Sequence, residues 1–380
     1  MNDTHGHSPD PLPPLDLIPE DVRSLADYEH RARAHLRAEI WHHIQSGAGP
    51  ETSLAANRKQ FDRYRLVPRM LSDMQGATTE TSLFGLRHAS PILLAPVAYH
   101  RLACPQGELA TASAATALDT TMVVSTLSSV PLEDVAKAVY ATTAELGRPM
   151  PPPLWFQLYF QAEREHTAEL VRRAESAGYQ VIVFTVDSAI KRADFTLPPG
   201  VEAANLAGMP TLTQTAHPAG GPILFGTSLM DSALTWESLD WLRSQTRLPI
   251  VVKGLLSAED ARLARDHGAD GIIVSNHGGR VLDGLASPID QLPSMVEAID
   301  DAIPVLLDSG VRHGTDVLKA LALGAKAILI GRPQIHALAV AGAKGVAHML
   351  HIIRAELELA MAHVGCKSSD SINNCYLKEL

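Results

Sequence analysis

Eight short apolar runs recur along the chain, and each is followed by a polar or glycine-containing turn and an amphipathic segment. The runs cover residues 92–95, 122–125, 155–158, 181–186, 250–253, 271–275, 305–308 and 327–330. A short apolar run between turn residues is typical of a buried strand, and strands that alternate with helices form parallel sheets. Eight such units predict an α/β fold, the (β/α)₈ or TIM barrel. A doubly wound sheet is the alternative that the pattern leaves open.

Segments outside these units define the expected domain organisation. Residues 1–20 are rich in proline and aspartate and are expected to form a disordered tail, and residues 21–380 are expected to form a single domain. Within it the barrel proper spans about residues 91–345, and residues 21–90 form an N-terminal helical extension that covers the barrel bottom or part of its mouth. Residues 193–235 form an insertion between strands 4 and 5, interpreted as a mobile lid over the active face or as disordered padding.

Charge and composition argue against several classes of partner. A formal net charge of −10 disfavours nucleic acid and anionic membranes, because both need clustered basic surface. No apolar run approaches the roughly 20 residues of a membrane helix, and the N-terminus lacks a secretory signal pattern. Three cysteines without CxxC spacing argue against a disulfide framework, so we expect a cytoplasmic protein. We expect no metal site, and we interpret His348 and His351 as surface residues.

The hexapeptide Ser-Asn-His-Gly-Gly-Arg at residues 275–280 ends the sixth apolar run and carries the clearest chemical signal. Histidine is the side chain best suited to moving a proton near neutral pH, which makes His277 a candidate base. Arginine grips a carboxylate through two parallel hydrogen bonds, which makes Arg280 a candidate anchor. The pair predicts a site that holds an acid and takes a proton from it.

Most of the other run ends are polar as well, and in a barrel the catalytic groups gather at the C-terminal ends of the strands. These positions are Ala95 to Ala98, Ser125, Gln157 with Tyr159, Thr185 with Asp187, Lys253, Ser275, Asp308, and Gly331 with Arg332. Because an unpaired buried ammonium group is costly, Lys253 predicts an anionic or electron-rich ligand.

The last two run ends fit a phosphate group. Gly310, Arg312, Gly331 and Arg332 offer small residues, backbone N–H groups and two guanidinium groups, and barrels often bind phosphate after strands seven and eight. Together with the polar groups at the other strand ends, they predict a phosphorylated planar cofactor. No GxGxxG motif follows an early strand, so a Rossmann dinucleotide site is disfavoured.

These motifs resemble those of the FMN-dependent 2-hydroxy acid oxidases and dehydrogenases, the family of glycolate oxidase, lactate oxidase and the mandelate-oxidising enzymes. The resemblance runs from about residue 25 to about residue 366, and its most specific piece is SNHGGR at 275–280, followed by Asp283. Supporting pieces are LAPVA at 94–98, QGELATA at 106–112, WFQLY at 155–159, FTVD at 184–187, VVKG at 251–254, GTDVLKALALGA at 314–325 and IGRP at 330–333. The stretch APVAYHRL with TLSSV at 126–130 is most similar to the hydroxymandelate oxidases.

The resemblance implies FMN as the cofactor of the barrel and assigns residues to it. Backbone contacts to the flavin would come from Ala95, Pro96, Val97 and Ala98. The isoalloxazine and ribityl groups would be held by Ser125, Gln157, Thr185, Lys253 and Ser275. The ribityl and phosphate groups would be held by Asp308, Gly310, Arg312, Gly331 and Arg332.

The same resemblance implies the catalytic roles. His277 would take the hydroxyl proton of the substrate as hydride passes from the α-carbon to flavin N5, and Asp187 would orient and stabilise the resulting imidazolium. Tyr159 would hydrogen-bond the substrate, and Arg280 would bind its carboxylate. Lys253 would offset the negative charge that develops on the reduced flavin.

Three positions depart from the family pattern. His43 stands where the family often has a tyrosine that contacts the substrate carboxylate, and Leu127 stands where glycolate oxidases have a tryptophan, which leaves an apolar pocket wall. The segment after Asp187 is one or two residues shorter than the usual Gly-Arg-Arg segment, and Arg192 is the candidate for the second arginine of the carboxylate clamp. A weaker clamp favours a bulkier, aryl or otherwise atypical 2-hydroxy acid.

The prediction is a flavoenzyme that oxidises a 2-hydroxy acid to the 2-oxo acid and is reoxidised by O₂ or another acceptor. Ala98 lies where oxidases of the family tend to carry alanine, which favours an oxidase. The alternatives are an FMN barrel that acts on a substrate without a free carboxylate, a non-redox FMN isomerase, and a barrel that binds a metabolite without turnover. The resemblance also implies a homo-oligomer, either a tetramer or an octamer.

Overall fold

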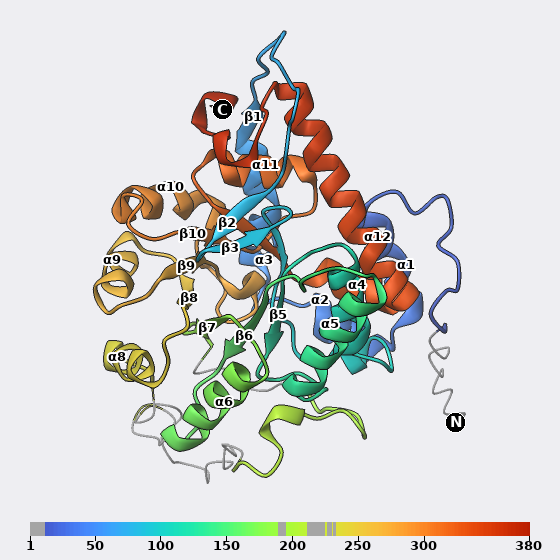
Figure 1. Ribbon diagram of the computed structural model, residues 1–380, viewed down its shortest axis with the longest axis vertical. Coiled ribbons are helices and arrows are strands. Elements are labelled where there is room, and N and C mark those ends of the chain that lie inside the picture. Colours follow the sequence, from blue (N-terminus) through green and yellow to red (C-terminus); the bar gives the residue numbers. More distant parts are fainter. Residues whose placement is uncertain (1–11, 189–194, 211–224, 226–229, 231–232) are drawn as a thin grey trace, which may run out of the picture.

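The computed structural model describes residues 12–188, 195–210, 225, 230 and 233–380. Eight parallel strands close into a barrel in the order β10-β11-β4-β5-β6-β7-β8-β9, which confirms the predicted fold (Figure 1). The strands are β4 (Ile92–Leu94), β5 (Met122–Ser125), β6 (Leu154–Leu158), β7 (Val181–Thr185), β8 (Ile250–Leu255), β9 (Gly271–Val274), β10 (Val305–Leu307) and β11 (Ala327–Ile330). Every predicted run overlaps one of them, although β6 begins one residue before its run and β8 ends two residues after its run.

The strands are continuously apolar because both of their faces are buried. In β7, for example, Val181 and Val183 pack inside the barrel, whereas Ile182 and Phe184 pack against the surrounding helices. The interior is filled largely by side chains from alternate positions of the strands, among them Leu93, Val123, Trp155, Val251, Ile273, Leu306 and Leu329. The barrel is therefore a packed core, and a ligand can enter only at its ends.

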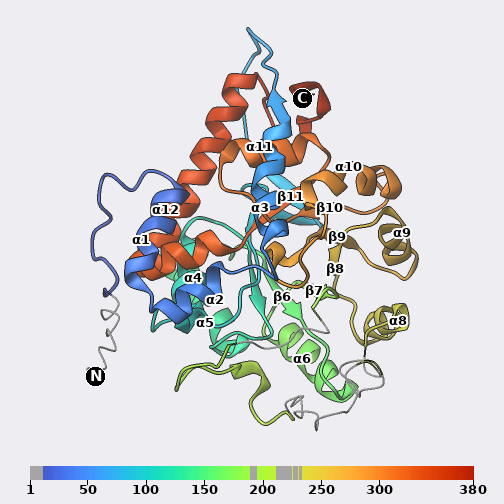
Figure 2. The same ribbon diagram turned by 180° about the vertical axis from the view of Figure 1, so that it is seen from behind.

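Helices surround the strands, as Figures 1 and 2 show from opposite sides. They are α4 (Glu108–Ala117), α5 (Leu132–Glu145), α6 (Arg164–Ser176), α8 (Trp236–Gln245), α9 (Ala258–Asp266), α10 (Pro288–Ile299), α11 (Gly314–Ala322) and α12 (Arg332–Val364). Non-helical backbone at Ala341 and Gly342 divides α12 into two segments. Among the described helices α12 alone is long and apolar enough to span a membrane, but 67% of its most apolar window is buried, as in a core helix of a globular protein.

The N-terminal extension covers both ends of the barrel. Helix α1 (Leu25–His35) packs along α12, whereas α2 (Ala38–Gln45) and α3 (Thr52–Lys59) lie near the C-terminal ends of the strands, α3 against the short helix η4 (His277–Gly279). The hairpin of β2 (Thr81–Leu83) and β3 (Leu86–His88) lies at the opposite end, where Leu83 joins the interior cluster.

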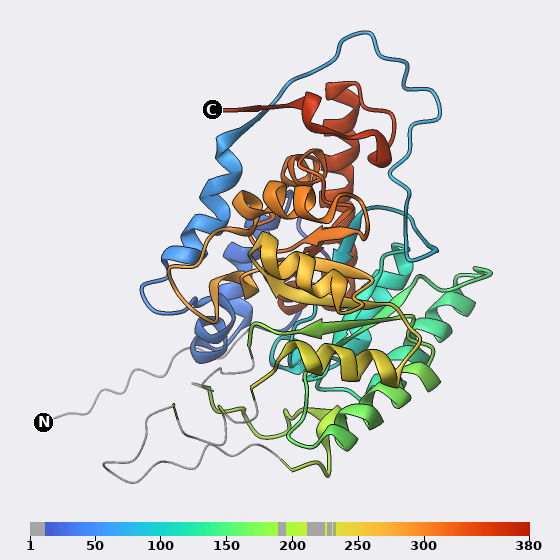
Figure 3. The same cartoon turned by 90° about the vertical axis from the view of Figure 1, so that its left-hand side faces the viewer.

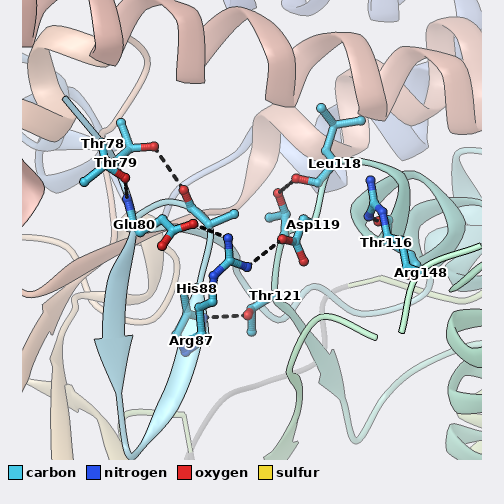
Figure 4. A network of polar contacts seen from close by, with 12 residues as sticks. Thr78, Thr79, Glu80, Arg87, His88, Thr116, Leu118, Asp119, Thr121 and Arg148 are labelled. Carbon is cyan, nitrogen blue, oxygen red and sulfur yellow. Dashed lines mark hydrogen bonds and ion pairs between the residues drawn. The ribbon is translucent and has the colours of Figure 1, made fainter. Parts of the chain in front are cut away.

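A polar network fastens this hairpin to the bottom of the barrel (Figure 4). Arg87 binds Glu80 within the hairpin and also Asp119, which precedes β5, at 3.1 Å. The Nδ1 atom of His88 lies 2.8 Å from the hydroxyl of Thr121. Because both contacts reach the same turn, the hairpin closes the N-terminal end, and the opposite end remains as the place for a site.

The remaining elements lie outside the barrel. The strand β1 (Tyr64–Leu66) pairs antiparallel with β12 (Leu377–Glu379), and Figure 3 shows the loop between β1 and β2 extending beyond the helices. The other short 3₁₀ helices are η1 (Gln60–Arg63), η2 (His100–Leu102), η3 (Ala204–Leu206), η5 (Ser369–Ser371) and η6 (Asn374–Tyr376).

Two predicted segments lie partly outside the described residues. The tail expected to be disordered through residue 20 is docked from Leu12 onward, because the backbone N–H groups of Leu12 and Leu15 donate to Ala34 and Val340 at 3.0 and 2.7 Å. Residues 195–210 of the insertion pack on the loop after β5 and on the start of α5, where the Asn205 side chain donates to the Thr126 carbonyl at 3.2 Å and accepts from the backbone N–H of Leu132 at 2.8 Å. Most of the remainder is not described, and the lid stays a prediction.

Candidate active site

The C-terminal mouth of the barrel collects polar side chains from six strands. Ser125 and Thr185 end β5 and β7, Gln157 and Lys253 lie within β6 and β8, and Ser275 and Asp308 follow β9 and β10. All six are buried. Parallel strands bring their carboxyl ends to one edge, and this geometry unites residues that are far apart in the sequence. The structure thus brings together the strand-end residues predicted from the sequence.

His277 and Asp187 form a hydrogen-bonded pair at this mouth. The Nδ1 atom of His277 lies 2.8 Å from Oδ1 of Asp187, and 22% of the histidine side chain remains exposed. Burial is the largest influence on the pKa of His277 and lowers it, and the raising effect of Asp187 does not fully offset this. The imidazole is therefore uncharged near neutral pH. Because the carboxylate only accepts, Nδ1–H donates to it and Nε2 is left as a proton acceptor.

The carboxylate of Asp187 stays ionised beside the imidazole. Burial raises the pKa of Asp187, but His277 and Lys253 together outweigh burial and hold that pKa below its ordinary value. Its second oxygen, Oδ2, is buried without a hydrogen-bond partner in the described chain. A fixed negative charge at this point can stabilise an imidazolium that forms when His277 takes a proton.

Lys253 keeps its charge although it is buried. Its Nζ lies 3.0 Å from Oδ2 of Asp308 and donates to the hydroxyl of Ser275, also at 3.0 Å. Burial lowers the pKa of Lys253, but the negative charges of Asp308 and Asp187 raise it by more than burial lowers it, so the net shift is upward. The site therefore contains a permanent ammonium group, which can stabilise negative charge that develops on a bound ligand.

Two buried polar atoms at the mouth have no hydrogen-bond partner among the described residues. The Gln157 Oε1 atom accepts from the Ser125 hydroxyl at 3.1 Å, whereas its Nε2 has no partner among the described residues. The Thr185 hydroxyl likewise is buried and has no partner among the described residues. Buried donors and acceptors are nearly always paired, so these two atoms fit the rim of a heteroatom-rich ring such as isoalloxazine. The residues present therefore fit FMN.

Arg280 is held by the last turn of α2. Its Nη1 donates to the backbone oxygens of His43, Ile44 and Ser46 at 2.8, 3.0 and 3.2 Å. These carbonyls carry the negative end of the helix dipole, which favours a guanidinium group. Only Nη1 makes these three contacts, so the other side of the guanidinium can bind a carboxylate.

Arg332 uses the same helix end. Its Nε and Nη2 donate to the oxygens of Ile44 and Ser46 at 2.9 and 3.1 Å, and its Nη1 donates to Gly278 at 3.0 Å. Burial, followed by the charges of Arg280 and Arg312, lowers the pKa of Arg332 to about 9. Three guanidinium groups therefore share a site with too little negative charge, and a bound phosphate dianion would correct this.

The residues predicted to hold a phosphate lie at the last two strand ends, with one difference in detail. The Arg332 guanidinium is already hydrogen-bonded to backbone carbonyls. Arg332 would therefore contact a phosphate through its backbone N–H at the start of α12. The Arg312 guanidinium lies 3.8 Å from Glu29. Gly310 adopts a φ of +86°, and a Cβ atom there would lie 2.0 Å from the Asn57 carbonyl oxygen, so only glycine fits.

The predicted substrate residues lie around the same mouth. Burial raises the pKa of Tyr159, while the nearby charges of Lys253 and Arg280 lower it in part, so its hydroxyl stays a neutral donor. The Leu127 backbone N–H donates to the Ser125 hydroxyl at 3.1 Å. The His43 ring stacks on Phe195 with centroids 4.1 Å apart and planes at 20°. Arg192, the proposed second clamp residue, lies outside the described residues.

Other parts of the site were not predicted. The Ser309 hydroxyl accepts from the Gly278 N–H at 3.0 Å and donates to Asp308 at 2.8 Å, joining the sixth and seventh strand ends. Asn276, inside the recognised hexapeptide, pairs with Asn57 on α3, and no pattern links two residues so far apart in sequence. Among the described residues no group of three His, Cys, Asp or Glu side chains converges as a metal site.

A closed barrel whose C-terminal mouth combines a neutral histidine, an ionised aspartate, a buried lysine and several arginines fits an oxidoreductase built around a phosphorylated flavin. The chain belongs to the FMN-dependent dehydrogenase family, whose model matches residues 32–379. It is an FMN-dependent enzyme that oxidises 2-hydroxy acids.

Individual relatives match over nearly their whole length. An L-lactate oxidase of Alicycliphilus denitrificans is 44% identical over 370 residues, which cover 96% of this chain and 98% of that protein. A 4-hydroxymandelate oxidase of Amycolatopsis orientalis is 45% identical over 353 residues, which cover 91% and 95%. The crystal structure of a mandelate oxidase with (S)-2-phenylpropionate is similar with a TM-score of 0.82 and 42% identity, covering 94% of this chain and 98% of that one.

Proposed function

We propose that the protein oxidises aryl 2-hydroxy acids to the corresponding 2-oxo acids and passes the electrons to O₂. The observation that carries the chemistry is the 2.8 Å contact between His277 and Asp187 beside the carbonyl-held Arg280. It supplies a neutral base and a carboxylate anchor in one mouth. A protein that only bound a metabolite would have no need to bury His277, Asp187 and Lys253 together.

The proposed steps assign one task to each side chain. Arg280 binds the substrate carboxylate through the donors that do not contact α2, and the Tyr159 hydroxyl hydrogen-bonds the substrate. His277 Nε2 takes the proton of the 2-hydroxyl group, and Asp187 stabilises the imidazolium that results. The imidazole must be neutral before this step, and the lowered pKa of His277 meets that condition at neutral pH.

The cofactor would be held by polar groups at the strand ends, among which Gln157 Nε2 and the Thr185 hydroxyl have no partner among the described residues. Gln157, Thr185, Ser275 and Lys253 would contact the ring system, and Gly310, Arg312, Gly331 and Arg332 would contact the phosphate. FMN, when bound, supplies an acceptor for the two electrons and the hydrogen that leave the α-carbon. The positive Lys253 would then lie where charge accumulates.

Two features support an aryl side chain on the substrate. Leu127 offers an apolar wall, and the stacked rings of His43 and Phe195 offer an aromatic surface near Arg280, which donates to the His43 backbone oxygen. Aromatic rings gain from such stacking. Relatives that act on hydroxymandelate and mandelate, by their names, support the same choice. The lactate oxidase relatives make a small aliphatic acid the second candidate.

The choice of O₂ as acceptor rests on Ala98 and on relatives. Ala98 ends the LAPVA segment that would face the flavin, and the resemblance associates alanine there with oxidases. The L-lactate and 4-hydroxymandelate relatives are oxidases by name. An oxidase would release hydrogen peroxide as it turns over.

Anaerobic mixing of the FMN-loaded protein with a panel of acids tests the proposal directly. (S)-Mandelate, 4-hydroxymandelate and lactate are compared by the rate at which each bleaches the flavin absorbance, and air is then admitted. We expect mandelates to react fastest, with rapid return of absorbance and formation of peroxide. Faster bleaching by lactate would favour the second candidate, and slow recovery in air would favour another acceptor.

The assembly and location of the enzyme are proposed separately. We infer a homotetramer or an octamer, supported by the loop between β1 and β2, on which Met70 and Leu71 are 74% and 105% exposed, as a subunit contact would use. We also propose a cytoplasmic location, supported by the three cysteines, none of which forms a disulfide. Light scattering tests the first inference, and localisation of a tagged chain tests the second.

A further inference from the structure

Two buried asparagines pair side by side next to the candidate base. The Nδ2 atom of Asn57 donates to Oδ1 of Asn276 at 2.8 Å, and Nδ2 of Asn276 donates back to Oδ1 of Asn57 at 2.7 Å. The residues are 2% and 1% exposed and lie 219 positions apart in the chain. A reciprocal pair of amide hydrogen bonds fixes the relative orientation of both side chains, because each needs the other in one plane.

Asn276 also organises the loop that carries the base. Its Oδ1 accepts from the Gly279 N–H at 3.1 Å, and its Nδ2 donates to the Ala286 carbonyl at 3.1 Å. His277, the next residue, has a φ of +56°, which is unusual for a residue with a side chain. Such a conformation persists only where its surroundings hold it. The bonds made by Asn276 are suited to hold it.

Helix α3 provides a rigid support for the pair. A Cβ atom at Gly279 would lie 2.7 Å from the Leu54 backbone nitrogen, and one at Gly310 would lie 2.0 Å from the Asn57 carbonyl oxygen. The helix is therefore packed backbone to backbone between the loop that carries His277 and the loop of the phosphate site. Asn57 has little freedom to move, so its amide can act as a fixed reference for Asn276.

We propose that Asn57 and Asn276 are positioning residues, which hold His277 at the distance and angle needed to take the substrate proton. Neither touches the substrate in this scheme. Removing either amide leaves the other buried without its hydrogen-bond partner, and the loop that carries His277 is expected to move away from the geometry seen here. The proposal rests on the base role of His277 and not on the choice between aryl and aliphatic acids, so any acid that reduces the wild-type flavin can serve in the test.

The test measures the anaerobic rate of flavin reduction at saturating substrate in FMN-saturated protein. Asn57→Ala, Asn276→Ala and the double variant are compared with Ser53→Ala. Ser53 is a matched control, because it is buried on the same helix and donates to the Leu285 carbonyl at 3.1 Å without touching Asn276. This rate is read in folded, loaded molecules, so a loss of stability alone does not change it.

We expect Asn57→Ala and Asn276→Ala to slow flavin reduction by about tenfold or more relative to Ser53→Ala. The double variant is expected to be no slower than Asn276→Ala, since the two amides act as one unit. Equal rates in Asn57→Ala and Ser53→Ala would overturn the proposal. If the wild-type flavin is not reduced by any acid, the proposed function fails first, and the two failures are thus distinct.

Asn57→Asp separates hydrogen bonding from packing, and it replaces Asn57→Ala if that variant does not fold. The substitution keeps the size of the side chain but places an acceptor where Asn57 donates to Asn276. We expect it to slow reduction as much as the alanine variant, whereas a wild-type rate would show that only volume matters and would overturn the proposal.

Hydrogen–deuterium exchange gives a readout that is independent of activity. The backbone amides of residues 277–280 are expected to exchange faster in Asn57→Ala and Asn57→Asp than in wild type, with no such change in Ser53→Ala. Unchanged exchange in both Asn57 variants would mean that the pair does not hold the loop.

Discussion

Gly254 on β8 lies so close to Asp187 that a Cβ atom at position 254 would be 2.5 Å from the carboxyl carbon of Asp187. The carboxylate that partners His277 is therefore set against the backbone of a neighbouring barrel strand. The φ of +110° at Gly254 is also one that residues with side chains rarely adopt. Gly254 thus supports the orientation of His277 indirectly, because it contacts Asp187 and Asp187 contacts His277.

The first prediction concerns this contact. Gly254→Ala should displace Asp187 and slow anaerobic flavin reduction by about 100-fold, because misplacing a catalytic partner by about 1 Å costs that much. Gly268→Ala is the control, since it has a φ of +85° but meets only ordinary contacts with Arg243 at 3.6 Å. Stopped-flow rates and melting temperatures are compared for the two. Equal loss of rate in both would mean that backbone strain, and not Asp187, is responsible.

The second prediction concerns pH. The base must be neutral to accept a proton, and the pKa of His277 is lowered by burial below its ordinary value of about 6.5. kcat/KM should therefore rise with pH in the acid range and be level through neutrality. Asp187 raises the pKa of His277, so Asp187→Asn should move the acid limb to lower pH and lower the plateau. An acid limb that moves to higher pH would contradict the assigned pair.

The third prediction separates binding of the carboxylate from chemistry. Arg280→Lys cannot contact three carbonyls of α2 and also grip a carboxylate with two donors, so kcat/KM for a free acid should fall by about 10- to 100-fold, mostly through KM. The amide of the same 2-hydroxy acid is the control substrate. If acid and amide lose equally, Arg280 does not bind the carboxylate, and a substrate without a free carboxylate becomes the better reading.

The fourth prediction tests the aromatic surface. Phe195→Ala removes the ring that stacks on His43, and an aromatic pair contributes about 0.5–1.5 kcal/mol. kcat/KM for mandelate should fall by up to about tenfold, whereas that for lactate should change little. Steady-state assays with both acids measure the ratio. A proportional fall for both acids would place the effect outside the side-chain pocket.

The fifth prediction uses a cofactor without phosphate. Arg312→Gln should weaken FMN binding by about 10- to 100-fold, since a charged hydrogen bond to the phosphate is lost. Riboflavin lacks the phosphate, so its affinity should be unchanged. Fluorescence titration of the apoprotein with each compound measures both constants. Parallel weakening of riboflavin would show that Arg312 supports the pocket in general.

The barrel could be predicted almost completely because its evidence is local. A strand buried on both faces must be apolar at every position, so runs such as 181–186 and 327–330 reveal β7 and β11 within a window of a few residues. The convergence of strand ends follows from the fold itself, which is why His277, Lys253 and Asp308 could be expected in one mouth. The tail was less predictable, since its proline-rich sequence does not reveal that Leu15 bonds to Val340.

What the sequence determined by itself is the set of strands, the polar residues that follow most of them and the chemical types available there. The tertiary structure alone decided how these residues are used. It bonded His277 to Asp187 across 90 positions, committed the Arg332 guanidinium to α2, and paired Asn57 with Asn276. The physical reason is that strand formation depends on burial pattern within a short segment, whereas these contacts exist only after the barrel closes and the helices of the extension pack on its mouth.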